Sequence, residues 1–418
     1  MIVYLVCYAA SLLLALGRHY LLSGAGLLAA AVYLYASDYI RSGNLLHLRG
    51  IFALSFVGGQ GLACMKLSYL SQAWSAGTWL GLLAAFAGFY LAFYYLEAFS
   101  GEASVRVGGH SGAVQRRGVE SYAGTVFFCA VALAALSAGC FAIEAVYMGY
   151  IPLLLRGVPH AYSYFHVTGL HYLTVSCVLV PALSVIYFCI EGGRSRGRLV
   201  CMLLADAAAV AIPLLCVSRS QLLFAVLLAL ITYIQMEHQL NPIYVVFALA
   251  GLIVLYILLT IARSHDTAYL NTVFEMKRHL PIFVTQPYIY IANNYDNFDC
   301  LVKGLVKHSW GMKMLAPFWT LTGLKFLVPS LTAFPYYVTK EELTTLTMFY
   351  DAYYDFGIIG VFIFSAILGA AAYLLMRISS VRTVCTLHAV IVFHNLVQQS
   401  VHMVLFRGDS GCDISGIA

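Results

Sequence analysis

The stretch IYVVFALAGLIVLYILLTIA, residues 243–262, decides the fold class of this chain. It contains no charged residue and is 20 residues long. An α-helix of that length crosses the hydrocarbon core of a bilayer, which is about 30 Å thick. Apolar runs of similar length recur along all 418 residues, so the sequence predicts an all-α polytopic membrane protein.

We predict about eleven transmembrane helices (10–12) within a single polytopic membrane domain, residues 1–418. The predicted spans are about 2–17, 20–37, 50–70, 78–99, 121–143, 167–190, 199–217, 221–235, 243–262, 356–376 and 384–405. Residues 1–17 are not a cleavable signal peptide, because no basic residue precedes the apolar run and a second span follows at once.

The composition excludes several other classes of protein. Hydrophobic residues make up 62% of the chain and charged residues 10%, whereas a soluble domain has about 25% charged residues. A disordered protein, a secreted disulfide scaffold and a nucleic-acid binder are therefore excluded. The eleven cysteines form no C-x-x-C pair, and most lie in apolar stretches where cysteine behaves as a small hydrophobe. We predict no metal site and no cofactor.

The distribution of arginine in the short loops predicts the orientation. On one side are ten arginines, and on the other side four. The ten are Arg41, Arg49, Arg106, Arg116, Arg117, Arg194, Arg196, Arg198, Arg377 and Arg382, and the four are Arg18, Arg156, Arg219 and Arg407. Since basic loops stay in the cytoplasm, the N-terminus is predicted to be cytoplasmic.

Residues 263–355 then form one large extracytoplasmic loop, which we treat as a subdomain. It carries 16 of the charged residues in 93 positions. Five prolines are expected to break it into short pieces, namely Pro281, Pro287, Pro317, Pro329 and Pro335. Its stretch KMLAPFWTLTGLKFLVPSL, residues 313–331, is aromatic and basic, and is predicted either to lie in the membrane interface or to pack within the loop.

Ionisable residues in or beside the spans are candidates for function, since charges in the bilayer are costly. Arg219 lies in a tight outer turn, where its guanidinium fork suits a phosphate; its alternative role is to anchor the helix end. Lys66 lies near the outer end of the third span and is either a substrate ligand or a snorkelling side chain. Asp206 is mid-span, and we expect it to hydrogen-bond a neighbouring helix.

Two further groups lie in the predicted outer loop. Arg263 and His265 directly follow the ninth span and offer a cation and a base. The stretch YIANNYDNFD, residues 290–299, alternates aromatic rings with amides and carboxylates. Sugar-binding sites use that mixture, because rings stack on sugar faces while amides and carboxylates bond hydroxyls. The alternative is a hydrated turn.

Two aspartates precede the tenth span. Asp355 is predicted to cap the start of that helix. Asp351 is freer, and it is the second candidate for a base beside His265.

Four stretches of the chain together resemble the Wzy-type oligosaccharide repeat-unit polymerases, the O-antigen polymerases. They are Gly149-Tyr150-Ile151-Pro152-Leu153-Leu154 with Gly169-Leu170-His171-Tyr172-Leu173; Ser218-Arg219-Ser220; Tyr290 to Asp299; and Thr344-Thr345-Leu346 with Tyr354-Asp355-Phe356-Gly357-Ile358-Ile359-Gly360. Their order and the one large outer loop near the C-terminus also match. The resemblance covers about residues 145–376.

The resemblance implies a GT-C-like glycosyltransferase at the outer face of a bacterial plasma membrane. It would transfer a glycan chain from undecaprenyl diphosphate onto the next lipid-linked repeat unit, without a nucleotide sugar. In that reaction Arg219 and Arg263 would bind the diphosphate, with Arg156 and Lys66 in reserve. His265 or Asp351 would be the base. The acceptor sugar would be held by Asn293, Asn294, Asp296 and Asn297.

The expected partners are the bilayer, the lipid-linked oligosaccharides and, as a further candidate, a chain-length regulator. Two alternatives remain open. The first is a ligase of the O-antigen type, which has a similar topology. The second is a transporter, such as a flippase of the same lipid-linked sugars. Transporters often show matched halves with broken helices, and the sequence shows no paired halves.

Overall fold

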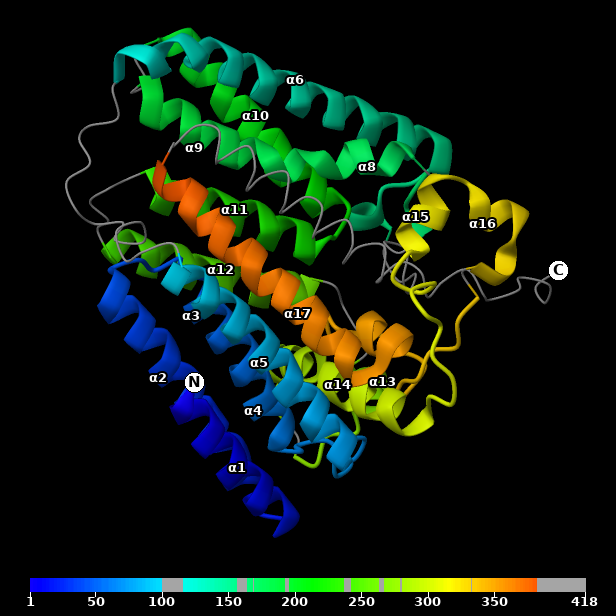
Figure 1. The fold of residues 1–418 in the computed structure, drawn as a ribbon. Coiled ribbons are helices and arrows are strands. Elements are labelled where there is room, and N and C mark those ends of the chain that lie inside the picture. The colour runs from blue at the N-terminus through cyan, green and yellow to red at the C-terminus, as the bar shows by residue number, and fades with distance from the viewer. Residues whose placement is uncertain are drawn as a thin grey trace, which may run out of the picture. The chain divides into compact units, whose positions relative to one another are not determined.

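The computed structural model describes residues 1–99, 116–155, 164–167, 169–191, 195–236, 242–262, 267–278, 280–331 and 333–381. In this part of the chain every regular element is helical (Figure 1). The sequence predicts a single domain, whereas contacts between residues divide the chain into two compact units. Unit 1 comprises Met1–His110 and Thr267–Ala418, and unit 2 comprises Ser111–Asp266.

Unit 1 joins the N-terminal helices to the C-terminal third of the chain. Its elements are α1 (Ile2–Leu16), α2 (Tyr20–Ser42), α3 (Leu48–Phe52), the π-helix η1 (Ala53–Val57), α4 (Gly58–Cys64), α5 (Ala76–Phe99), α13 (Thr267–Phe274), α14 (Ile282–Gly304), α15 (Ala316–Leu321), α16 (Leu324–Leu327), the 3-10 helix η5 (Pro329–Leu331) and α17 (Tyr350–Val381).

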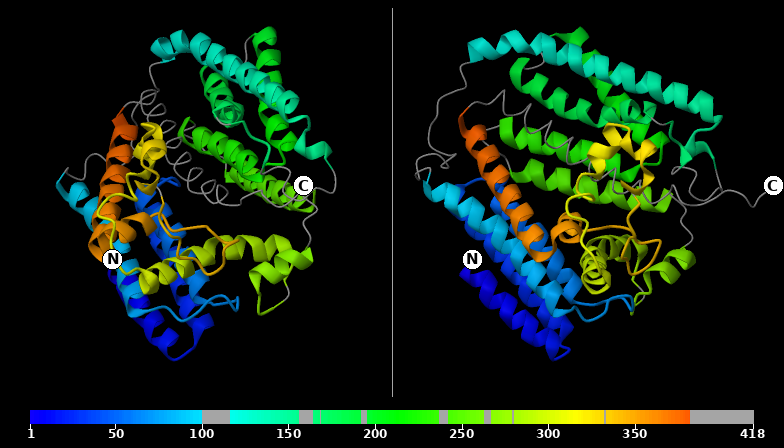
Figure 2. Two further views of the ribbon diagram at one scale, coloured as in Figure 1. Left: turned by 90° about the vertical axis from the view of Figure 1, so that its right-hand side faces the viewer. Right: turned by 45° about the vertical axis from the view of Figure 1, so that its right-hand side comes forward.

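Helices α5 and α17 lie side by side in every view (Figures 1 and 2). Glycine permits this close approach. A Cβ atom at Gly88 would lie 2.3 Å from the carbonyl oxygen of Phe362, and one at Gly369 would lie 2.3 Å from that of Phe89. In lipid no hydrophobic effect drives helices together, so their association depends on close van der Waals packing. Small residues at the contact allow the two backbones to approach closely enough for it.

The predicted outer loop does not have a core of its own. Tyr288, Tyr295 and Phe298 of α14 belong to the same apolar cluster as Phe56 and Phe86 of the N-terminal helices. The described residues of segment 263–355 therefore pack as part of unit 1. Pro287 was expected to break this segment, and that expectation is wrong, since Pro287 lies inside α14. The buried face of α14 continues on both sides of Pro287, so packing outweighs the loss of one backbone donor.

Unit 2 is a bundle of long apolar helices. Its elements are α6 (Arg116–Met148), the 3-10 helix η3 (Pro152–Leu154), α8 (Leu170–Val175), the 3-10 helix η4 (Ser176–Leu179), α9 (Val180–Glu191), α10 (Arg196–Leu215), α11 (Arg219–Met236) and α12 (Pro242–Ala262). Within it, α6 packs against α8, α9 and α10. Asp206 of α10 accepts a hydrogen bond of 2.7 Å from the hydroxyl of Ser184 on α9, as expected of a mid-span carboxylate beside a neighbouring helix.

Six helices in the described residues are long and apolar enough to cross a membrane, which supports a membrane location. They are Tyr20–Ser42, Ala76–Phe99, Ala123–Met148, Leu170–Ile190, Arg196–Leu215 and Tyr350–Arg377. The predicted spans 2–17, 50–70 and 221–235 correspond to shorter apolar helices, and 243–262 corresponds to α12. The predicted span 384–405 lies outside the described residues. The predicted count of about eleven is therefore not confirmed.

Candidate functional site

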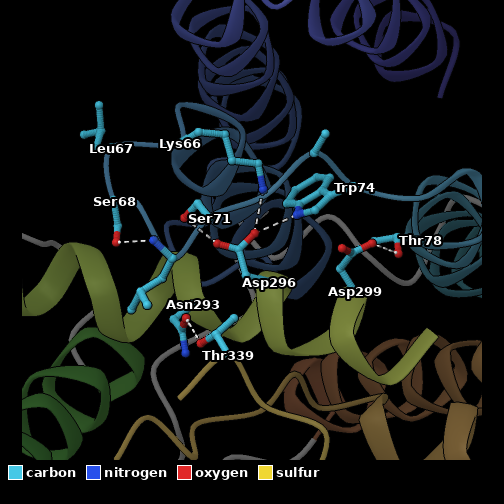
Figure 3. Close-up of polar contacts among 12 residues, drawn as sticks. Lys66, Leu67, Ser68, Ser71, Trp74, Thr78, Asn293, Asp296, Asp299 and Thr339 are labelled. Atoms are coloured by element: carbon cyan, nitrogen blue, oxygen red, sulfur yellow. Dashed lines mark hydrogen bonds and ion pairs between the residues drawn. The ribbon is translucent and has the colours of Figure 1, made fainter. Parts of the chain in front are cut away.

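The polar stretch 290–299 is part of α14, and its side chains leave the helix toward two loops (Figure 3). Asp296 points to the loop that follows α4. Its Oδ1 accepts from Lys66 Nζ at 2.5 Å and from Trp74 Nε1 at 2.7 Å. Its Oδ2 accepts from Ser71 Oγ at 2.6 Å. Three donors from one loop therefore converge on a single carboxylate.

Lys66 and Asp296 form a buried ion pair, with side-chain exposures of 4% and 3%. The Lys66 ammonium also lies 4.2 Å from the centre of the Trp74 ring. A buried charge is tolerated only when it is paired and hydrogen-bonded, and both conditions are met. These contacts attach the loop after α4 to α14. Lys66 and Asp296, which the sequence analysis predicted to bind substrate, therefore have a structural role here.

Asp299 strengthens the same attachment one turn along α14. Its Oδ1 accepts from the Ser75 backbone N–H at 2.8 Å and from Thr78 Oγ1 at 2.6 Å. Its Oδ2 lies 2.5 Å from Lys303 Nζ, which is more exposed than Lys66. The start of α5 is thus positioned by the carboxylate of a residue more than 200 positions away.

Asn293 and Asn297 project to the other loop, residues 337–345. The Asn293 Oδ1 accepts from Thr339 Oγ1 at 2.7 Å (Figure 3). The Asn297 amide donates to the carbonyls of Leu343 at 2.7 Å and Thr345 at 2.8 Å, and its Oδ1 accepts from the Thr339 N–H at 2.8 Å. Both amides are buried. The hydrogen-bonding groups predicted to hold a sugar are thus used by the protein itself.

Asn294 differs from its neighbours because it is only half-buried. Its amide donates to the Tyr290 carbonyl at 2.8 Å, one turn back on the same helix. Of the four polar residues assigned to the acceptor, Asn294 is the one with a partly accessible side chain.

Asp351 stays accessible. It is half-buried, and its Oδ1 lies 3.7 Å from the ammonium of Lys313. Lys313 is itself buried among aromatic rings, with Tyr336 at 4.6 Å and Tyr354 at 4.7 Å from ring centre to nitrogen. A partly exposed carboxylate beside a cation and the exposed ring of Tyr336 suits a sugar hydroxyl.

The structure revises the predicted capping role of Asp355. Its carboxylate accepts the backbone N–H groups of Lys313 at 3.1 Å and Met314 at 2.8 Å, together with the Ser309 hydroxyl. It therefore fixes the turn 309–314. The backbone bends sharply two residues later at Gly357, whose φ of 62° falls where glycine is favoured.

Three predicted site residues, Arg156, Arg263 and His265, lie outside the described residues. Arg219 begins α11, while its side chain is outside the described part. Its helix follows the turn 216–218, in which Val217 has a positive φ of 55°. The predicted contacts of these four residues with a diphosphate stay predictions.

A second polar constellation lies within unit 2, and the sequence analysis missed it. Glu144, four residues before the end of α6, is fully buried. Its Oε1 lies 3.1 Å from His171 Nδ1 and accepts from the Val167 N–H at 3.0 Å. Its Oε2 lies 3.2 Å from the same ring nitrogen. His171 is one-fifth exposed, with 21% of its side chain accessible.

This pair lies where three motif stretches meet. Tyr150 and Ile151, which follow α6, pack in the same apolar cluster as Phe165 and as Leu215 and Cys216 at the end of α10. The η3 turn contacts α10, and α8 contacts α6. The stretches 149–154, 169–173 and the turn before 219 therefore gather at one end of unit 2.

An open hollow of about 460 Å³ lies at this end. It is lined by Ala145, Val146, Gly149, Tyr150, Ile151, Leu154 and Leu155. Its volume falls within the range of about 300–1,000 Å³ that is usual for ligand sites.

A signal for Glu144 was present in the sequence. It is the lone charged residue of the apolar run 121–148, and intramembrane carboxylates are functional candidates by default. It escaped notice because the predicted span ended at residue 143. Within the described residues no group of three metal-ligating side chains occurs. Comparison with protein-family models, with curated proteins and with solved structures finds no match for this chain.

Proposed function

We propose that this chain is a membrane glycosyltransferase that polymerises lipid-linked oligosaccharide repeat units at the outer face of a bacterial plasma membrane. The donor is a glycan chain on undecaprenyl diphosphate, and the acceptor is the next lipid-linked unit. The observation that carries the proposal is the gathering of the motif stretches 149–154, 169–173 and the turn before Arg219 at one end of unit 2.

That arrangement supports the proposal because the reaction needs two kinds of group in one place. A cation must stabilise the departing diphosphate, and a base must take the proton of the acceptor hydroxyl. Arg219 follows the turn at this end, and an imidazole paired with a carboxylate lies in the same region. In this proposal Arg263 assists Arg219 at the diphosphate.

The apolar helices support a lipid-linked substrate. The end of α10 packs in the same apolar cluster as Tyr150 and Ile151, which line the hollow, and both α6 and α10 are long enough to cross a bilayer. The arginine-rich loops at the opposite ends of these helices favour the cytoplasm. The hollow then opens at the outer surface, where a lipid diphosphate has its headgroup.

The polar residues of unit 1 divide into two classes in this proposal. Asn293, Asp296, Asn297 and Lys66 hold the loops around α14, because their polar atoms already have protein partners. Asp351 and Asn294 have partly exposed side chains, and within this unit they stay candidates for binding a sugar.

A gene deletion followed by electrophoresis of surface glycans tests the proposal. Loss of a polymerase leaves a single repeat unit on the acceptor and removes the ladder of longer chains. Bare acceptor with accumulated lipid-linked polymer would instead identify a ligase. The absence of any surface unit, with lipid-linked units retained inside, would identify a flippase. Complementation with the wild-type gene must restore the ladder.

A further inference from the structure

Glu144 occupies an unfavourable place for a carboxylate. It is fully buried, it is the one charged residue of the run 121–148, and it lies in the last turns of α6. Burial penalises the charge, and the negative end of the helix dipole repels it. A residue that only filled space would be apolar here. The carboxylate instead hydrogen-bonds the imidazole of His171 and the backbone N–H of Val167.

The geometry fixes the role of each nitrogen of His171. Both oxygens of Glu144 approach Nδ1, at 3.1 and 3.2 Å. A carboxylate accepts hydrogen bonds, so Nδ1 carries the proton and the lone pair resides on Nε2. Among the described residues, Nε2 has no hydrogen-bond partner, and the ring is one-fifth exposed. The base-competent nitrogen is therefore Nε2, on a ring that is one-fifth exposed.

We infer that His171 is the general base of the polymerase reaction and that Glu144 is its positioning residue. This inference rests on the proposed function. It leaves the proposed role of Arg219 unchanged, but it names a base other than His265 and Asp351.

Nε2 of His171 takes the proton of an acceptor-sugar hydroxyl while that oxygen attacks the anomeric carbon of the donor glycan. The new carbon–oxygen bond forms as the bond from the anomeric carbon to the diphosphate breaks, and its electron pair leaves with the diphosphate. The proton remains on the imidazole, whose positive charge faces the Glu144 carboxylate. Water removes this proton after the product leaves.

In this proposal the acceptor binds in the hollow at the end of α6, which starts at the residue after Glu144. Its lining residues begin at Ala145, directly after Glu144, and continue through Tyr150. Tyr150 also packs edge-on against Phe165, with ring centres 5.6 Å apart. Aromatic and aliphatic walls fit the apolar faces of a sugar, so we expect an oligosaccharide to lie here with one hydroxyl toward His171.

The test uses the full-length protein in detergent and lipid-linked repeat units extracted from cells that lack its gene. Polymer length and initial rate are measured by gel electrophoresis. We expect His171→Ala to lower the rate at least 100-fold, the lower end for general-base catalysis. Added imidazole should restore part of that rate. Glu144→Gln should lower kcat about 10-fold or more and change KM little, and it should add little further loss in the His171→Ala background.

His166→Ala is the matched control. His166 is an exposed histidine whose ring centre lies 6.4 Å from that of His171, and its loss should leave the rate within about twofold. Thermal unfolding of each variant checks the fold. Wild-type activity in His171→Ala would overturn the inference. Loss of activity without imidazole rescue, at an unchanged unfolding temperature, would also overturn it. If the wild-type protein itself forms no polymer, the proposed function fails and the inference falls with it.

Discussion

Replacing Lys66 by methionine tests whether the Lys66–Asp296 ion pair has a structural role. The substitution keeps the length and most of the volume of the side chain but removes its charge. It leaves the Asp296 carboxylate 3% exposed and bonded only to Ser71 and Trp74. Breaking a buried ion pair from one side costs about 3–5 kcal/mol.

The expected effect is large enough to measure by differential scanning fluorimetry in detergent. At roughly 2 °C per kcal/mol, the lower end for domains of 150–250 residues, the apparent Tm should fall by about 6–10 °C. The double variant Lys66→Met with Asp296→Asn should recover part of that loss, because it leaves no unpaired charge. Lys303→Met is the matched control. Its pair with Asp299 is 42% exposed on the lysine side, so we expect a loss of only about 0–1 kcal/mol.

Two results would refute the structural role of the Lys66–Asp296 ion pair. If Lys66→Met unfolded at the wild-type temperature but no longer bound lipid-linked donor, Lys66 would be a substrate ligand, as the sequence predicts. Equal losses in Lys66→Met and in the double variant would show that the shape of the loop matters and the charge pair does not.

The other predictions concern the donor, the topology, the membrane interface and the helix contact in unit 1. Arg219→Lys should lose about 10- to 100-fold in polymerisation rate, since lysine lacks the guanidinium fork; equal rates at equal expression would remove Arg219 from the site. Cysteine placed at the exposed Lys307 should react with an impermeant maleimide in intact cells, whereas cysteine at Arg196 should not, relative to the unsubstituted protein; the reverse pattern would invert the orientation. Trp310, which is 76% exposed and whose ring centre lies 6.2 Å from that of Phe356 in α17, should be quenched by brominated lipids, and Trp310→Phe should remove most of that quenching; unchanged quenching in that variant would mean that another tryptophan contacts the lipid, and no quenching of the wild-type protein would place Trp310 in water. Gly88→Val should lower the apparent Tm, because a Cβ would meet the Phe362 carbonyl at 2.3 Å; an unchanged Tm would mean that α5 and α17 separate freely.

The sequence alone determined that this chain is built of membrane helices. Runs such as 243–262 carry that information locally, because an apolar segment in lipid must satisfy its backbone hydrogen bonds within itself, and a helix does so. The helices α1, α5, α10 and α12 accordingly begin and end within a few residues of the predicted bounds.

Local sequence could not determine what the polar residues do. The stretch 290–299 has a composition suited to a sugar site, yet it forms a helix in which residues 293 and 297 lie one turn apart and meet one loop, while residue 296 meets another. The partner of Asp296 is 230 positions away, and the partners of Asn297 are 42 to 48 positions away. No local pattern encodes such pairings, since they depend on how the helices pack.

The same reason explains the pair in unit 2. His171 lies in the motif stretch 169–173 and Glu144 in an apolar run 27 positions before it. Neither local pattern predicts that the two side chains are in contact. Only the packing of α8 against α6 brings the imidazole to the carboxylate. Loss of either partner would be costly, because a charge that is removed from water needs an opposite charge within the protein.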